Sequence, residues 1–237
     1  MSTPHSALLL IGSPKAGASA SLSLGQYLVD RLGDKGMATE VMAVGKMLKS
    51  SATAQELCAA VDAADLVVLA SPLYVDSLPA PVTKALEMIA EHRRRAAGGE
   101  PTVSRRSPAL AAIVQCGFPE ASHNDVALAI CRAFAVDAGL DWSGGLAMGG
   151  GGMTGGRPLT ELGGMMRHQR KALDLTGEAL ADGRPIPDEA VTLMARLPIP
   201  AAAYRFMGDV GWRKLAKGNG VRRDLKTRPF EAGAPAP

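Results

Sequence analysis

Short apolar runs alternate along this chain with longer stretches in which apolar residues recur at helical spacing. Residues 7–11 and 65–70 are apolar with little polar alternation, which is typical of parallel strands covered on both faces. Residues 21–32 carry leucine and valine at the spacing of one helix face, and Gly33 follows, as glycine often does at a helix end. By the same criteria we predict strands at 7–11, 39–44, 65–70, 109–115 and 140–148, and helices at 21–32, 53–63, 81–95, 123–138 and 159–181.

The order of these elements predicts the fold class. Five strands that alternate with helices favour a doubly wound α/β fold, with a parallel sheet and helices on both of its faces. Beyond Gly183 prolines interrupt the pattern, and one helix is predicted at 201–217. We therefore expect one domain at residues 1–185. We expect residues 186–237 to form a C-terminal extension with one helix and a disordered end, packed on the core or on another subunit.

Composition and charge narrow the function classes. Hydrophobic residues make up 47% of the 237, enough for a core, and the net charge of +3 is too small to argue for nucleic-acid binding. The three cysteines lie far apart, which predicts neither a zinc site nor an iron–sulfur cluster and fits a reducing compartment. No basic residue precedes the first apolar run, and no run approaches the roughly 20 residues of a membrane span. We expect a cytoplasmic protein with no metal and no membrane span.

The first candidate site is the loop GSPKAGASAS, which starts at Gly12. Its serines offer hydroxyl groups, Lys15 adds a positive charge, and the next helix directs unpaired amides toward the loop. The loop matches neither the dinucleotide-binding fingerprint nor the nucleoside-triphosphatase motif. Two interpretations stay open at this point: the loop holds a phosphate, or its serines only cap the helix.

The second candidate site is the loop SPLYVDSLPAP, which starts at Ser71 after the third strand. Three prolines stiffen this loop, and Tyr74 is one of only three tyrosines in the chain. A rigid loop with an aromatic ring beside the first loop suits a flat heterocyclic ligand, because ligands bind at the carboxyl ends of strands in open α/β sheets. The alternative is an ordinary crossover in which Tyr74 packs on its own sheet.

Taken together, GSPKAGASAS and SPLYVDSLPAPVTKALE resemble the flavodoxin-like NAD(P)H-dependent FMN reductases. That family has a GSPR-type first loop and a P-x-Y loop that leads into a helix with Lys and Glu near its start, as Lys84 and Glu87 stand here. Lys15 replaces the usual arginine, and the cysteine motif of an iron–sulfur branch is absent. The resemblance implies a flavodoxin-like five-stranded parallel sheet of order 2-1-3-4-5, followed by a C-terminal helical extension.

The resemblance also implies a function and a binding site. Hydride would pass from NADPH or NADH through bound FMN to a small-molecule electron acceptor such as a quinone or a flavin, in a homo-oligomer such as a homodimer. Cys116 is interpreted as a small buried apolar residue rather than a nucleophile. The implied cofactor-binding residues are Ser13, Lys15, Ser19, Ala20 and Ser21 around the phosphate, Pro72, Leu73, Tyr74 and Val75 along the isoalloxazine, and Cys116, Gly117 and Phe118 at its other edge.

Several alternatives remain open from the sequence. The protein could be a flavodoxin-like electron carrier that uses the same site, although such carriers are usually acidic. It could be a flavin-free protein that keeps the fold for protein–protein interaction. It could also be another nucleotide-binding enzyme that holds a different ligand. The glycine run 149–156 either closes over a ligand or only connects two elements. The run 92–95, HRRR, is either a solvated face or a dock for the NADPH phosphate. The basic residues around Trp212 either pack against a partner subunit or anchor the tail on anionic lipid.

Overall fold

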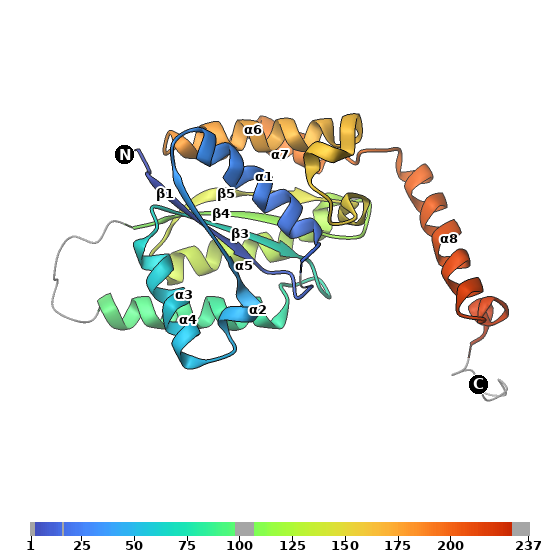
Figure 1. Ribbon diagram of the computed structural model, residues 1–237, viewed down its shortest axis with the longest axis horizontal. Helices are drawn as coiled ribbons and strands as arrows, with labels where there is room; N and C mark the ends of the chain where they lie inside the picture. Colours follow the sequence, from blue (N-terminus) through green and yellow to red (C-terminus); the bar gives the residue numbers. More distant parts are fainter. Residues whose placement is uncertain (1–2, 16, 98–106, 229–237) are drawn as a thin grey trace. The chain divides into compact units, whose positions relative to one another are not determined.

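The sheet has the strand order that the sequence predicted. The structure is a computed structural model that describes residues 3–15, 17–97 and 107–228 (Figure 1). All strand pairs are parallel, and the order is β2-β1-β3-β4-β5, the flavodoxin-like arrangement. The strands are β1 (Ser6–Ile11), β2 (Ala38–Ala43), β3 (Leu66–Pro72), β4 (Ala109–Gln115) and β5 (Asp141–Met148).

The helices follow the prediction closely in the first half of the chain and less closely after β5. The predicted helix at 159–181 is divided: a 3-10 segment ends at Met166, and the α-helix starts at Arg167. Within the 3-10 segment, Gly163 has φ 54° and ψ −143° and interrupts the helical backbone. The α-helices are α1 (Ala20–Asp34), α2 (Val44–Met47), α3 (Ser51–Ala63), α4 (Ala80–Ala97), α5 (Asp125–Asp137), α6 (Arg167–Ala181), α7 (Asp188–Ala195) and α8 (Ala201–Gly218), and the 3-10 segments are η1 (Ala121–Asn124), η2 (Gly151–Thr154), η3 (Leu159–Met166) and η4 (Arg222–Lys226).

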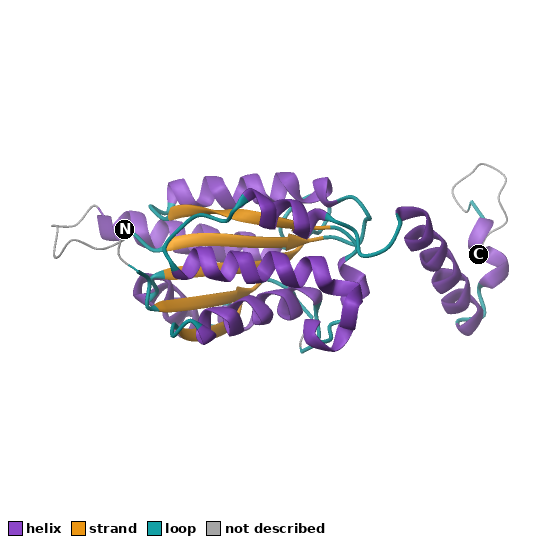
Figure 2. Ribbon diagram, turned by 90° about the horizontal axis from the view of Figure 1, so that it is seen from above, coloured by secondary structure: helices purple, strands orange, loops and turns teal. Residues whose placement is uncertain are grey.

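Helices lie on both faces of the sheet (Figure 2), and the core consists of two apolar layers, one on each face. Successive residues of a strand point to opposite faces, so Leu8 and Leu10 of β1 belong to one layer while Leu9 and Ile11 belong to the other. Helices α1, α6 and α7 cover the second of these faces, and α2 to α5 cover the first. Burial on both faces explains why the strands appear as continuous apolar runs in the sequence.

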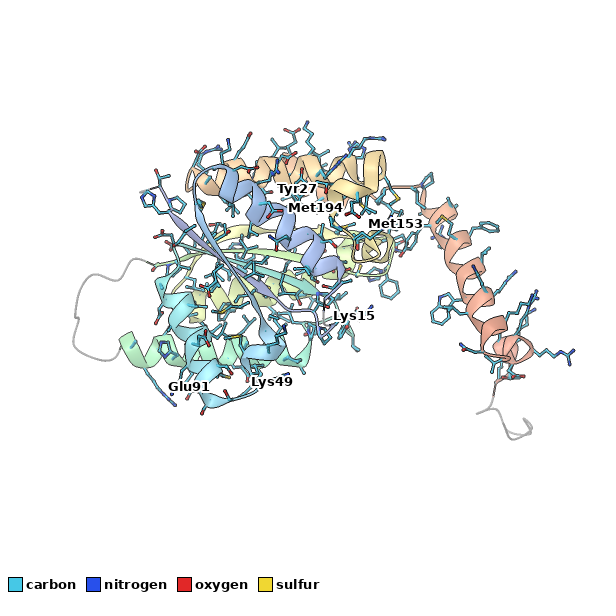
Figure 3. The ribbon with its side chains drawn as sticks, in the orientation of Figure 1. Lys15, Tyr27, Lys49, Glu91, Met153 and Met194 are labelled. Carbon is cyan, nitrogen blue, oxygen red and sulfur yellow. The ribbon has the colours of Figure 1, made fainter. Side chains whose placement is uncertain are left out.

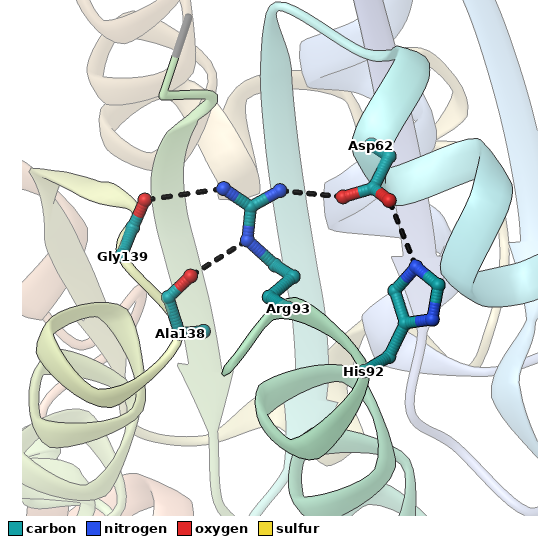
Figure 4. A network of polar contacts seen from close by, with 5 residues as sticks. All are labelled: Asp62, His92, Arg93, Ala138 and Gly139. Atoms are coloured by element: carbon teal, nitrogen blue, oxygen red, sulfur yellow. Dashed lines mark hydrogen bonds and ion pairs between the residues drawn. The ribbon is translucent and has the colours of Figure 1, made fainter. Parts of the chain in front are cut away.

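A buried carboxylate ties three helices together at the end of the sheet where the strands begin (Figure 4). Asp62 of α3 pairs with the Arg93 guanidinium at 2.6 Å and contacts the His92 imidazole at 2.9 Å. Arg93 also donates to the carbonyl oxygens of Ala138 and Gly139, which follow α5. This cluster therefore fixes α3, α4 and the end of α5 relative to one another.

The chain divides into two units, residues 1–198 and 199–237. The first unit includes α7, a helix that the sequence pattern did not predict, because α7 packs on α6 and β5. The second unit contains α8 and η4. The expected disordered end, residues 229–237, lies outside the described residues. None of the described helices is both long and apolar enough to span a bilayer.

Candidate functional site

A cavity of about 350 Å³ lies at the end of the sheet where the strands finish. The paired registers bring Ile11, Pro72, Gln115 and Met148 to this edge, so the loops that follow β1, β3, β4 and β5 meet there. Figure 3 labels Lys15 in the first of these loops and Met153 in the last, both at this end of the sheet. The cavity is lined by Ser13, Lys15, Ala18, Ser19, Ala20, Pro72, Leu73, Tyr74, Gln115, Cys116, Gly117, Gly151, Gly152, Thr154, Gly155 and Gly156.

The loop after β1 supplies polar groups at the start of α1. Ser19 is the N-cap of α1, and its hydroxyl oxygen accepts a hydrogen bond from the Leu22 amide at 3.1 Å. That bond uses one lone pair and leaves the O–H free to donate, so capping and ligand binding are compatible for this side chain. The first amides of a helix have no intrahelical acceptor, and Ala20 beside Ser19 also lines the cavity. This corner of the cavity is therefore suited to an anion.

The loop after β3 holds Tyr74 against the cavity through a tight turn. The Tyr74 amide donates to the Ser77 carbonyl at 2.8 Å, and the Ser77 amide donates back to the Tyr74 carbonyl at 3.1 Å. Between them Val75 and Asp76 have positive φ of 50° and 55°. Tyr74 lines the cavity, whereas the side chain of Val75 is 99% exposed and does not.

The loop after β4 contributes the buried thiol of Cys116 and the backbone of Gly117 to the cavity lining. Burial raises the pKa of the Cys116 thiol, although hydrogen bonding with the Phe118 backbone and the Asn124 side chain partly offsets this. A thiol with a raised pKa carries little thiolate at neutral pH and is a poor nucleophile. Phe118 is exposed beside His123, with ring centroids 4.5 Å apart, and does not line the cavity.

The loop after β5 forms a wall of the cavity that the sequence analysis left undecided. Gly151, Gly152, Thr154, Gly155 and Gly156 all line it. Hydrogen bonds from the Gly150 amide to the Phe118 carbonyl (2.7 Å) and from the Gly151 amide to the Cys116 carbonyl (2.8 Å) fasten this loop to the one after β4. The glycine run therefore closes the site and is not a loose connection.

Most of the predicted residues come together in this one cavity. Nine of the twelve line it, and Ser21, Val75 and Phe118 do not. Ser21 is buried in the first turn of α1, and its hydroxyl has no hydrogen-bond partner among the described residues. Gln115 and Thr154 are lining residues that the sequence analysis did not select. A glutamine at the end of an otherwise apolar strand was the available signal for the first of them.

The arginines at the end of α4 bind within the chain. Arg93 pairs with Asp62, Arg94 with Asp137, and Arg95 with Glu91. The helix α4 starts beside the cavity and runs back along the sheet, so these residues lie at the opposite end of the strands (Figure 1). Their position and pairing argue against a dock for the NADPH phosphate. Within the described ranges, no group of three or more His, Cys, Asp or Glu side chains is arranged to hold a metal ion.

Comparison with protein families gives a direct match. A family model described as NADPH-dependent FMN reductase matches residues 6–128, which run from β1 into α5 and include three of the four loops around the cavity. The loop after β5 lies beyond the matched residues. A comparison with curated proteins found no match.

Solved structures show the same fold at low sequence identity. An NADH:FMN oxidoreductase in its apo form has a TM-score of 0.53 and 14% identity, over 84% of this chain and 98% of that one. An FMN-dependent NADH-azoreductase from Bacillus anthracis, in complex with FMN, has a TM-score of 0.52 and 12% identity, over 75% and 99%. A rubredoxin oxygen:oxidoreductase from Desulfovibrio gigas has a TM-score of 0.51 and 12% identity. The match covers 76% of this chain but only 36% of that longer chain.

The cavity fits the groups of an FMN molecule. Hydroxyl and amide donors gather at the start of α1, where a phosphate would be bound by the positive end of the helix and by Lys15. Tyr74, Leu73 and Pro72 give an apolar side suited to a flat ring system. Glycines line the opposite wall, and at Gly151 a Cβ atom would lie 1.8 Å from the Gln115 side-chain oxygen. The space is thus kept open by residues without side chains.

Proposed function

Because this chain belongs to the NADPH-dependent FMN reductase family, we propose that it passes electrons from NADPH or NADH, through bound FMN, to a small-molecule acceptor such as a quinone or a free flavin. The observation that carries this proposal is the meeting of two loops at one cavity. Lys15, Ser19 and the start of α1 lie on one side of it, and Pro72, Leu73 and Tyr74 lie on another. The first group suits a phosphate and the second suits an isoalloxazine ring.

Each group of residues has a distinct proposed role. Ser13, Lys15, Ser19 and Ala20 bind the phosphate through hydroxyl, ammonium and amide donors, and the polar first turn of α1 that contains Ser21 supports them. Pro72, Leu73 and Tyr74 position the isoalloxazine, and the neighbouring Val75 forms the exposed tip of that loop. Cys116 and Gly117 contact the ring from the loop after β4, and Phe118 is exposed outside the cavity.

The chemistry needs no acid–base pair from the protein. Bound FMN supplies the redox centre, which accepts a hydride from the nicotinamide and delivers electrons to the acceptor. The residues of this chain bind, orient and partly enclose the cofactor. Cys116 takes no covalent part, because burial raises its pKa and its thiol is hydrogen-bonded to the loop that carries it.

The family and the open cavity favour a small acceptor over a protein acceptor. Electron carriers that recognise proteins usually present a strongly acidic surface, whereas this chain has a net charge of +3. We further propose that the protein works in the cytoplasm as a homo-oligomer, in which α8 packs against another subunit. The exposed apolar side chains of α8 support that arrangement.

The test is the visible absorbance of the purified protein after incubation with FMN and removal of unbound flavin. The proposal predicts an oxidised-flavin spectrum that bleaches when NADPH or NADH is added without oxygen, and that recovers when a quinone is supplied. Flavin that is bound but not reduced by either nucleotide would support an electron carrier instead. No retained flavin, together with an unchanged melting temperature on adding FMN, would contradict the proposal and leave a flavin-free interaction protein.

A further inference from the structure

The side-chain amide of Gln115 is a polar group at the cavity that is not engaged by the described part of the chain. Gln115 is the last residue of β4, is 8% exposed, and lines the cavity. Among the described residues its side-chain amide has no hydrogen-bond partner, although its backbone carbonyl accepts from Leu73 at 2.8 Å. The fully buried side-chain atoms without a partner in the described ranges do not include those of Gln115, so its amide is accessible from the cavity and available to a polar group bound there.

The direction of Gln115 follows from the alternation along β4. Ala111 and Ile113 belong to the apolar layer under α1 and α6, whereas Leu110, Ala112 and Val114 belong to the opposite layer. Gln115 follows Ala111 and Ile113 at every second residue, so its side chain lies on the face of the sheet that is covered by α1. Its amide thus lies between the start of α1, where the phosphate is proposed to bind, and the loops that hold the ring.

The glycine loop after β5 holds this amide in place. A Cβ atom on Gly151 would lie 1.8 Å from the Gln115 side-chain oxygen, so only glycine lets that oxygen rest against the loop. The Thr154 hydroxyl donates to the Gly151 carbonyl at 3.0 Å and accepts from the Gly156 amide at 3.2 Å. Thr154 is fully buried, and its two bonds fix the curvature of the loop.

The same loop also reaches the first loop. A Cβ atom on Gly156, where φ is +71°, would lie 2.7 Å from the carbonyl carbon of Ala18 and 2.9 Å from the Ser19 nitrogen. The backbones of the two loops are therefore in close contact at the start of α1. Together they enclose the stretch of the cavity between the phosphate corner and the ring loops, with Gln115 at its base.

We propose that Gln115, held by Gly151 and Thr154, binds the ribityl hydroxyl groups of FMN. This inference rests on the proposed function. A primary amide offers both donors and an acceptor, which matches hydroxyl groups that also donate and accept. A phosphate only accepts, and its donors are already provided by the first loop and the start of α1. Gln115 is thus a binding residue for the polyol part of the cofactor, and Gly151 is a positioning residue.

The test compares flavins that differ only in this part. Dissociation constants for FMN, riboflavin and lumiflavin, which has a methyl group in place of the ribityl chain, are measured by quenching of flavin fluorescence. Gln115→Leu keeps the volume and removes the amide. It is expected to weaken FMN and riboflavin alike, by about three- to tenfold, the value of one or two hydrogen bonds. Lumiflavin binding should not change.

A second variant and a control keep the result interpretable. Gly151→Ala should displace the amide and produce the same selective loss, so the inference does not depend on one substitution. Gln55→Leu, on the exposed surface of α3, should alter none of the three constants. Melting temperatures measured without flavin show whether each variant folds.

Two outcomes would overturn the inference while leaving the proposed function intact. Equal weakening of all three flavins would place Gln115 at the ring, and unchanged constants for FMN and riboflavin would mean that its amide does not contact the cofactor. Failure of the wild-type protein to bind any of the three flavins would instead contradict the proposed function itself.

Discussion

Val75 combines a β-branched side chain with a left-handed backbone, at φ 50°. This conformation costs an L-residue roughly 1–2 kcal/mol, and asparagine tolerates it much better. Because the side chain is 99% exposed, burial does not offset the cost. We expect Val75→Asn to raise the free energy of unfolding by about 1 kcal/mol in urea denaturation.

An exposed valine in an ordinary helix provides the comparison. Val136 lies on α5 with regular geometry, and valine and asparagine have similar helix propensities. Val136→Asn should therefore change the free energy of unfolding by less than about 0.5 kcal/mol. If both variants behaved alike, the backbone of Val75 would not be under strain.

The thiol of Cys131 should make stability fall in alkaline solution. Burial raises its pKa from 9.0 to about 12 in the folded protein. Below pH 9 both the folded and the unfolded chain keep this proton, so its contribution to stability is complete there. Above pH 9 the unfolded chain ionises first, and stability falls until the folded pKa is reached, by up to about 1.4 kcal/mol per pH unit.

A variant without the thiol isolates this effect. Cys131→Ala lowers the free energy of unfolding at pH 7 through loss of packing, and the deficit relative to wild type should shrink by about 1–2 kcal/mol between pH 7 and pH 10.5. Val61→Ala, a buried residue of α3 without an ionisable group, should show a deficit that does not vary with pH. Parallel behaviour of the two variants would show that the thiol does not titrate as stated.

At the scale of single residues, the sequence predicts which side chains carry suitable chemical groups better than it predicts which way those side chains point. The resemblance of its loop to the FMN reductases selects Ser19 as a binding residue, and the structure places it both at the N-cap and in the cavity. Gln115 was not selected because the apolar residues before it assign it to a strand, and the sequence does not show that the end of this strand reaches the cavity. Val75 lies beside Tyr74 in the sequence, yet the turn between Tyr74 and Ser77 directs it away from the cavity. Such directions depend on tertiary contacts that no local pattern encodes.

At the scale of elements, the start of α1 serves both stability and binding, and one substitution can separate these roles. Aspartate caps helices as well as serine does, so Ser19→Asp should leave the melting temperature unchanged or slightly higher. Its negative charge would stand beside the proposed phosphate. We expect the affinity for FMN to fall at least about tenfold, and the affinity for riboflavin, which has no phosphate, to change far less.

The equivalent cap of another helix is the matched control. Ser50 caps α3, where its hydroxyl accepts from the Thr53 amide, and it does not line the cavity. Ser50→Asp should leave the dissociation constants of FMN and riboflavin unchanged. If Ser19→Asp weakened both flavins equally, the phosphate would not lie at the start of α1.

Elements with strong periodicity were predicted nearly residue by residue, and elements set by tertiary contacts were not. Strand β4 spans Ala109–Gln115, as the apolar run indicated. The helix predicted at 159–181 is broken because Gly163 adopts a backbone conformation outside the helical region. Helix α2 has only four residues, which is too short for a helical repeat of apolar residues to be recognised. The closing role of the 149–156 loop depends on contacts with residues far away in the chain, such as Ala18 and Pro119.

At the scale of the whole molecule, the second unit has a composition that calls for a binding surface. Residues 199–237 contain eight lysines and arginines and three acidic residues, and α8 exposes Phe206, Trp212 and Leu215. A unit of this size is too small to bury a core of its own. Gly208 and Gly211 lie inside α8 and lower its intrinsic helix propensity, so a surface that covers its apolar side chains would stabilise the helix.

Apolar groups on two separate sides of α8 favour a protein surface over a lipid one. At 100° per residue, Trp212 and Leu215 lie on one side of the helix, while Phe206 and Val210 lie on another beside Arg213 and Lys217. A helix that lies on a membrane needs a single apolar face. The arrangement supports packing between subunits, which is the role proposed for this helix.

Substitutions on α8 should therefore change the assembly state and not the fold. We expect the wild-type protein to be a dimer by light scattering at micromolar concentration. Trp212, exposed in the single chain, would be covered in the proposed interface, where large aromatic side chains dominate the binding energy. Trp212→Arg should therefore raise the dissociation constant of the dimer at least tenfold. Lys214→Gln, an exposed position on the same helix, should remain dimeric. A wild-type monomer at every concentration would contradict the subunit role. Binding of that monomer to anionic but not to neutral vesicles would assign α8 to a lipid surface, because only the basic residues would then account for the difference.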